Sequence, residues 1–167
     1  MRFLATLLLG TSLLSAVGAD AQVPTQPMQV EWRGGRPVIS FDAGSMVDDH
    51  VRREVQSGLR RTVVFRVYAY EGGGSRPVAL EQVSIRMTYD LWDDQYRIER
   101  QTSVTRSEEV APTLEEALRR SFQVRDLVVG AAGDYQRVAG RELHFAVLAE
   151  FNPVSRSTVD RVRQLIA

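Results

Sequence analysis

The chain of 167 residues contains no cysteine and no lysine, so all 21 of its basic residues are arginine. Without cysteine it cannot form a disulfide, use a thiol nucleophile or carry a lipid on a thiol. Without lysine it cannot form a Schiff base with a substrate or place a phosphate-loop lysine beside a nucleotide. These two absences exclude several common catalytic chemistries.

Charge of one sign is not in excess either, because 21 acidic residues balance the 21 basic ones. A protein that gathers nucleic acid by electrostatic attraction normally carries an excess of positive charge. We therefore expect no nucleic-acid partner.

Histidine is scarce, and neither His50 nor His144 has the neighbouring histidine or acidic residue of a zinc motif. The stretch AGSM at residues 43–46 lacks the glycine pattern of a Gly-x-Ser-x-Gly nucleophile elbow. A Ser-His-Asp arrangement built from distant segments remains open at this point. We expect no metal site and no cofactor, and we assign no catalytic residue.

The only long apolar run stands at the start of the chain. Arg2 precedes an apolar stretch over residues 3–17, and Ala19-Asp20-Ala21 supplies a small-x-small cleavage pattern. This layout is typical of a secretory signal peptide, and the run is too short for a comfortable membrane span. We expect cleavage near Ala21 and a periplasmic or secreted protein with no membrane span after cleavage. An uncleaved membrane anchor is the alternative.

The rest of the chain shows no internal repeat and no linker that would divide it. We predict a signal peptide over residues 1–21, an extended lead-in with two prolines over 22–29, and one domain over 30–167. A domain of that length can bury a core large enough to fold stably without disulfides, which agrees with the absence of cysteine in a chain expected to be exported.

Alternating and β-branched patterns predict strands. They cover residues 28–33, 36–43, 61–70, 78–91 and 141–151, with a shorter candidate at 124–130. Gly34-Gly35 fits a tight hairpin turn between the first two strands. The strand at 61–70 is apolar on both faces, so we expect it to be central and covered on both sides.

Three segments show the apolar spacing of a helix. The first, residues 45–59, places Val47, Val51, Val55 and Leu59 on one stripe. The second begins at Thr113, where Glu116 three residues later completes a capping box pattern. The third spans residues 157–166. The order of elements favours an α+β fold, with a mostly antiparallel sheet or an embellished β-sandwich and about three helices.

The stretch YDLWDDQYRI, residues 89–98, is the most distinctive part of the sequence. We predict a hairpin in which Leu91 pairs with Tyr96 and Asp90 pairs with Arg97. This register places the apolar pairs on one face of the hairpin and the opposite charges on the other, as cross-strand packing prefers. The loop would then be Trp92 to Gln95.

Two other interpretations of this stretch remain. A calcium loop would need ligands at alternating positions and a central glycine, which the stretch lacks. A pair such as Asp90 and Asp94 could serve glycoside hydrolysis, which uses two carboxyl groups across a sugar. A hairpin loop explains the acidic residues without a ligand, since aspartate hydrogen-bonds to the local backbone in turns.

The hairpin also supplies the candidate contact residues. An exposed tryptophan can anchor a partner, although simple packing at the rim of the domain would also explain it. We select Trp92, Tyr96 and Arg97 as the first candidates for binding, together with Asp93 and Asp94 in the same loop.

Four stretches, VQSGLRRTVVFRVYAY, MTYDLWDDQYRI, TLEEALRR and AEFNPVS, together resemble the exported bacterial domain-of-unknown-function family 4390. In that family a helix ending near a small-Gly-hydrophobic step leads into a strand. A Tyr- and Trp-bearing hairpin, an acidic helix and a late strand follow. The resemblance covers about residues 30–167, and this chain carries an Asp-rich hairpin where many members are more aromatic. The family has no established activity, so the resemblance assigns no catalytic residue.

These observations favour a non-enzymatic periplasmic domain that binds an envelope protein or a small ligand. A hydrolase that acts on envelope glycans through carboxylates is one alternative. A structural assembly subunit that associates through edge strands or the C-terminal helix is the other.

Overall fold

The computed structural model describes residues 27–72 and 74–153. The predicted signal peptide, residues 22–26 of the predicted lead-in, and the helix predicted at 157–166 lie outside the described residues. Within the described ranges, every helix is too short or too polar to cross a membrane.

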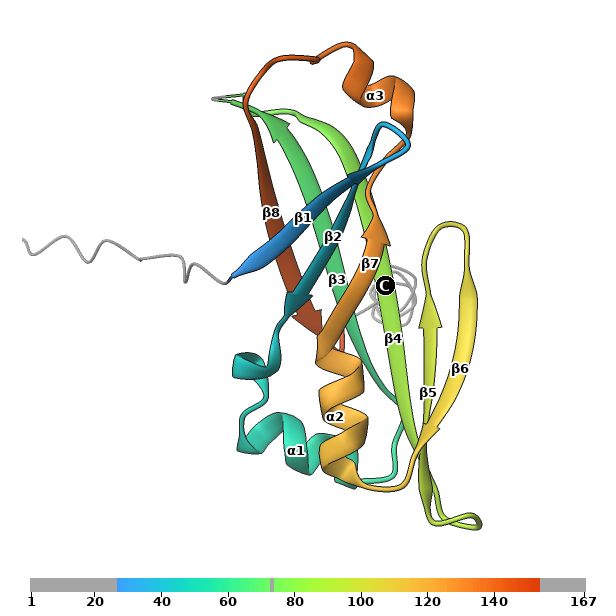
Figure 1. Cartoon of the computed structure of the whole chain (residues 1–167). Coiled ribbons are helices and arrows are strands. Elements are labelled where there is room, and N and C mark those ends of the chain that lie inside the picture. The colour runs from blue at the N-terminus through green and yellow to red at the C-terminus, as the bar shows by residue number, and fades with distance from the viewer. Residues whose placement is uncertain (1–26, 73, 154–167) are drawn as a thin grey trace, which may run out of the picture.

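The described residues form eight strands, three α-helices and one short 3-10 turn, η1 (Figure 1). In chain order these are β1 Met28–Arg33, β2 Arg36–Asp42, η1 Gly44–Met46, α1 Asp49–Gln56, β3 Arg61–Glu71, β4 Pro77–Asp90, β5 Gln95–Gln101, β6 Arg106–Ala111, α2 Leu114–Phe122, β7 Gln123–Val128, α3 Ala132–Gln136 and β8 Leu143–Phe151. The strands make two antiparallel sheets, in the orders β1-β2-β7 and β6-β5-β4-β3-β8. The predicted α+β class is confirmed.

Aromatic contacts join the two sheets and α2 into one core. The ring of Phe65 in β3 lies 5.5 Å from that of Phe41 in β2, edge to face. On its other side Phe65 meets Phe122 of α2 at 6.1 Å, also edge to face. All three rings are buried. Large apolar surfaces removed from water in this way supply most of the stabilisation of a small domain.

The strand predicted to be central, β3, is paired on both sides, by β4 and β8. Its side chains from Val63 to Ala69 on the inner face are fully buried. Tyr68 and Tyr70 on the outer face are only half-buried. Val64 on the same outer face is buried, with 6% exposure, so the central place of β3 is confirmed and the covering of its whole outer face stays a prediction.

The predicted turn between β1 and β2 is confirmed. Gly34 and Gly35 have φ angles of +58° and +74°, and they join Arg33 directly opposite Arg36. Two consecutive residues with positive φ define a hairpin turn that glycine adopts without a steric penalty.

The first predicted helix forms, but it is shorter than its apolar pattern suggests. Asp48 caps α1 by accepting a hydrogen bond from the Val51 amide at 2.8 Å, and Val51 and Val55 are buried. The helix ends before Gly58, which has a φ of +75°. Leu59 therefore lies beyond the helix and is 61% exposed, so its predicted place on the apolar stripe is wrong.

The second predicted helix begins where expected. The Thr113 hydroxyl accepts a hydrogen bond from the Glu116 amide at 3.2 Å, as an N-cap does. The Glu116 carboxylate, however, accepts from the guanidinium of Arg120 one turn later. At the other end of α2, Arg100 of β5 donates to the Arg120 carbonyl at 2.9 Å and so caps the helix.

Two elements were not anticipated from the sequence. Strand β6, with the sequence RSEEVA, lies at a sheet edge and is mostly exposed, so it lacks the alternation of a half-buried strand. Helix α3 has only five residues and buries one of them, Tyr135. Neither element is long enough or apolar enough to leave a periodic signal.

We predict that Thr113→Ala lowers the free energy of unfolding by about 1 kcal/mol, because it removes the N-cap of α2. Urea unfolding monitored by tryptophan fluorescence would measure the change. Thr113→Ser keeps the hydroxyl and should stay within about 0.5 kcal/mol of the parent protein. Equal losses in the two variants would show that the methyl group of Thr113, and not its hydroxyl, matters.

Candidate functional site

The loop that joins β4 to β5 carries the residues singled out by the sequence. Asp90 lies opposite Gln95 and Tyr89 opposite Tyr96, so the loop runs from Leu91 to Asp94. The predicted pairing of Leu91 with Tyr96 is therefore wrong, although the loop has the predicted length of four residues. The error shifts each partner by two positions, which leaves every side chain on its predicted face.

Asp90 fixes the backbone of this loop and explains the shifted register. One of its carboxylate oxygens accepts hydrogen bonds from the amides of Trp92 at 3.0 Å and Asp93 at 3.4 Å. The other oxygen accepts from the Arg97 guanidinium at 3.0 Å. These bonds, with that of the Trp92 amide the largest contribution, lower the pKa of Asp90. A general acid needs a raised pKa, so this carboxylate is poorly suited to that role.

Asp94 contacts Tyr89, which in turn packs against Tyr96 at the base of the loop. Asp94 has a φ of +50°, and its carboxylate accepts a hydrogen bond from the Tyr89 hydroxyl. That bond raises the pKa of Tyr89. The rings of Tyr89 and Tyr96 lie 4.9 Å apart, and Tyr96 is only 9% exposed. Tyr96 thus supports the hairpin from inside and offers little surface to a partner.

Trp92 projects from the tip of the hairpin and is 96% exposed. Leu91 beside it is also exposed. Arg97 lies behind the loop, where it contacts Asp90, Asp93 at 3.6 Å, and Glu108 of the next strand at 3.3 Å. The structure therefore brings Trp92, Asp93 and Arg97 together at the surface.

The three acidic residues of the loop are occupied by these contacts. Asp90 and Asp93 share Arg97, and Asp94 binds the Tyr89 hydroxyl. Across residues 27–72 and 74–153, no group of three histidine or acidic side chains is placed to hold a metal ion. The arrangement stiffens the hairpin tip and presents an apolar side chain.

The two histidines lie far from this loop in the sequence and are both exposed. His50 is in the first turn of α1, and His144 is near the start of β8. In the register of the sheet, His144 lies opposite Tyr70 of β3.

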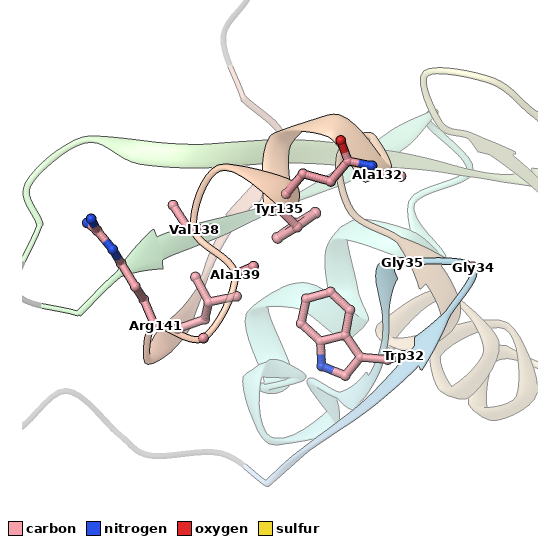
Figure 2. A pocket seen from close by; sticks show the side chains of 11 residues that line it. Trp32, Gly34, Gly35, Ala132, Tyr135, Val138, Ala139 and Arg141 are labelled. Atoms are coloured by element: carbon pink, nitrogen blue, oxygen red, sulfur yellow. The ribbon is translucent and has the colours of Figure 1, made fainter.

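A second candidate site was not recognised in the sequence. A groove of about 370 Å³ lies between the β1–β2 turn and the segment that joins α3 to β8. Figure 2 shows the Trp32 ring across the groove from Val138 and Ala139. Arg141 at the rim is ion-paired with Glu71, which neutralises its charge. The groove is therefore suited to an apolar group rather than to an ion.

Tyr135 forms a fixed wall of this groove. Its ring lies 5.3 Å from that of Trp32, edge to face, and its hydroxyl donates to the Val129 carbonyl at 2.9 Å. Burial, followed by the charge of Asp134, raises the pKa of Tyr135 to about 12. Trp32 remains 53% exposed. The one sequence signal for this site is an aromatic residue beside the Gly34-Gly35 turn.

Comparison with known proteins leaves the family of this chain open. No family model, no curated protein and no solved structure matches the chain. Membership of family 4390 therefore remains a proposal, and the geometry described above is the basis for any functional assignment.

We predict that Asp90→Asn destabilises the hairpin at neutral pH, because the neutral amide replaces a carboxylate that binds two backbone amides and Arg97. The pKa of Asp90 is lowered in the folded state, so its stabilising effect is present above the usual carboxyl value of 3.8. The effect is lost as the pH falls through the lowered value. Urea midpoints of wild type and variant should differ more at pH 7 than at pH 3.

Asp93→Asn is the matched control for that experiment, since the Asp93 carboxylate contacts the side chains of Gln95 and Arg97 and, unlike that of Asp90, accepts no backbone hydrogen bond given by the described residues. It should change the urea midpoint less than Asp90→Asn does. A difference between wild type and Asp90→Asn that is the same at both pH values would contradict the role of the ionised carboxylate.

We predict that Tyr135 limits stability in alkali. Its folded pKa of about 12 lies above the ordinary value of 10.0, so its contribution is complete below pH 10 and is lost as the pH approaches 12. Tyr135→Phe should be less stable at pH 7, where the bond to Val129 is lost, and should lose less stability from pH 9 to pH 11.5. Thermal unfolding midpoints measure both effects, and parallel curves for the two proteins would refute the assignment.

Proposed function

We propose that this protein is an exported, non-enzymatic binding domain of the cell envelope that holds its partner through the tip of the β4–β5 hairpin. The observation that supports this proposal most directly is the 96% exposure of Trp92 on a loop fixed by Asp90 and Arg97. The signal-like start of the chain supports export, and the absence of cysteine and lysine narrows the catalytic options.

A tryptophan whose backbone is held in place at a hairpin tip is well suited to partner binding. A rigid aromatic side chain loses little conformational entropy on binding, and its burial removes a large apolar surface from water. Tryptophan and arginine are also the residues most often found at energetic centres of interfaces. Trp92 and Arg97 provide both at one place, and exposed Leu91 extends the apolar surface.

The two alternatives, a glycan hydrolase and an assembly subunit, would depend on other residues than Trp92. A glycan hydrolase would depend on Asp90 and Asp94, yet Asp90 has a lowered pKa and both carboxylates are engaged within the loop. An assembly subunit would associate through the free edges of the sheets, which in the described residues include β1, β6 and β8. Neither alternative requires an exposed Trp92.

We predict that Trp92→Ala releases a bound partner while the domain remains folded. The experiment is native mass spectrometry of protein purified gently from the compartment in which it accumulates. A partner held through Trp92 should bind the variant at least about tenfold more weakly, the loss typical of an interface anchor.

Val104→Ala is the control, because Val104 is also highly exposed on a turn, the one between β5 and β6. It should retain the partner found with the wild type. If Trp92→Ala folds normally and keeps every partner, the assignment to the hairpin tip is wrong.

A further inference from the structure

A hollow of about 330 Å³ lies where strand β5 meets the junction of α2 and β7. Its lining is Arg100, Glu109, Arg119, Arg120, Gln123 and Arg125. Four arginines and a single acid therefore converge here, although the chain as a whole has no net charge. They come from β5, β6, α2 and β7, and α2 contacts each of the other three (Figure 1).

Two of these arginines have structural partners. Arg120 is ion-paired with Glu116 and with Glu109 at 3.3 Å, and it also donates to the Val110 carbonyl at 2.8 Å. Arg119 lies 3.6 Å from Glu116. Both stand in the last turn of α2, where positive charge complements the helix dipole. Helix stabilisation is sufficient to explain them.

Neither an ion pair within the described residues nor a place in the last turn of α2 explains the position of Arg100. Its half-buried guanidinium donates to the carbonyls of Arg120 at 2.9 Å and Gln123 at 3.5 Å, but no carboxylate of the described residues is ion-paired with it. Burial lowers the pKa of Arg100, and the charge of Glu109 opposes that shift. Removing a cation from water is costly. Glu109 offsets this cost only in part, since it is not ion-paired with Arg100, and a bound anion would reduce the cost further.

Arg125 supplies a second positive charge without a counter-ion. It lies in β7, beyond the end of α2, so the helix dipole does not account for it. Its guanidinium donates to the side-chain oxygen of Gln123 at 2.8 Å, and within the described ranges it has no ion-paired carboxylate. Arg100 and Arg125 thus line one hollow with two guanidinium groups that are not ion-paired with any carboxylate of the described residues.

We propose that this hollow binds a phosphoryl group. Two guanidinium groups that lack an ion-paired carboxylate match a dianion, and a phosphate monoester carries roughly −1.5 to −2 charges at pH 7. A carboxylate would neutralise only one of them. Guanidinium groups bind phosphate oxygens with two parallel hydrogen bonds, and they are the usual choice where this geometry matters. The site is independent of the hairpin tip and does not rest on the function proposed for it.

The test uses inorganic pyrophosphate as the probe, with the full chain, in isothermal titration calorimetry at pH 7 and constant ionic strength. We expect saturable binding below about 10 mM, and at least about tenfold weaker binding by Arg125→Gln. Arg125 is exposed, so this variant should fold. Arg137→Gln removes the same charge from an exposed residue just after α3 and should bind as the wild type does.

Two further comparisons make the result decisive. Trp92→Ala should bind pyrophosphate normally, which separates this site from the hairpin tip. Vesicles containing phosphatidic acid, whose headgroup is a phosphate monoester, are sedimented with each protein and distinguish a lipid headgroup from a free phosphate as the source of the phosphoryl group. Vesicle binding that Arg125→Gln loses and Arg137→Gln keeps would support the site with lipid as the source.

The proposal is overturned by either of two results. One is the absence of saturable binding to both pyrophosphate and vesicles. The other is an equal loss of binding in Arg125→Gln and Arg137→Gln, which would mean that the anion responds to total charge and not to this hollow.

Discussion

The packing of Phe65 against Phe41 and Phe122 is the contact on which the rest of the structure depends. Phe65 belongs to the five-stranded sheet, Phe41 to the three-stranded sheet, and Phe122 to the helix that connects them. Neither sheet could bury its apolar face alone, because each is open on the side that these rings close. The way the two sheets meet at this cluster sets where the hairpin tip, the groove and the arginine-lined hollow lie.

The hairpin tip extends away from that cluster, because β4 is the longest strand of the described chain at 14 residues. Beyond the packed core, the loop cannot rely on apolar burial for its shape. Asp90, Arg97 and the pair of Tyr89 with Asp94 supply the order instead, through hydrogen bonds and charge. The outcome is a fixed loop that presents Trp92 to solvent, and this combination is what makes it suitable for recognition.

Arginine has two different roles in this lysine-free chain. Arg97 and Arg120 are engaged by carboxylates, and they connect neighbouring segments. Arg100 is directed at the end of α2 and lies beside Arg125, with no such partner in the described residues. The planar guanidinium tolerates partial burial because it can donate to several carbonyl oxygens at once. The same property leaves it able to bind an anion.

Much of the fold follows from the sequence alone. The alternation in β2 and β3, the glycine turn at Gly34-Gly35 and the N-cap at Thr113 are local signals, since each depends on residues within a few positions. The sequence also indicated the acidic hairpin and the chemistry excluded by the missing cysteine and lysine.

The sequence did not reveal β6, which is too polar to show a strand pattern, or α3, which is too short, and it did not give the correct register of the hairpin. Only the tertiary structure decided that Tyr96 is buried, that Trp32 borders a groove, and that Arg100 and Arg125 share a hollow. Those outcomes depend on contacts between residues far apart in the chain, which no local pattern encodes.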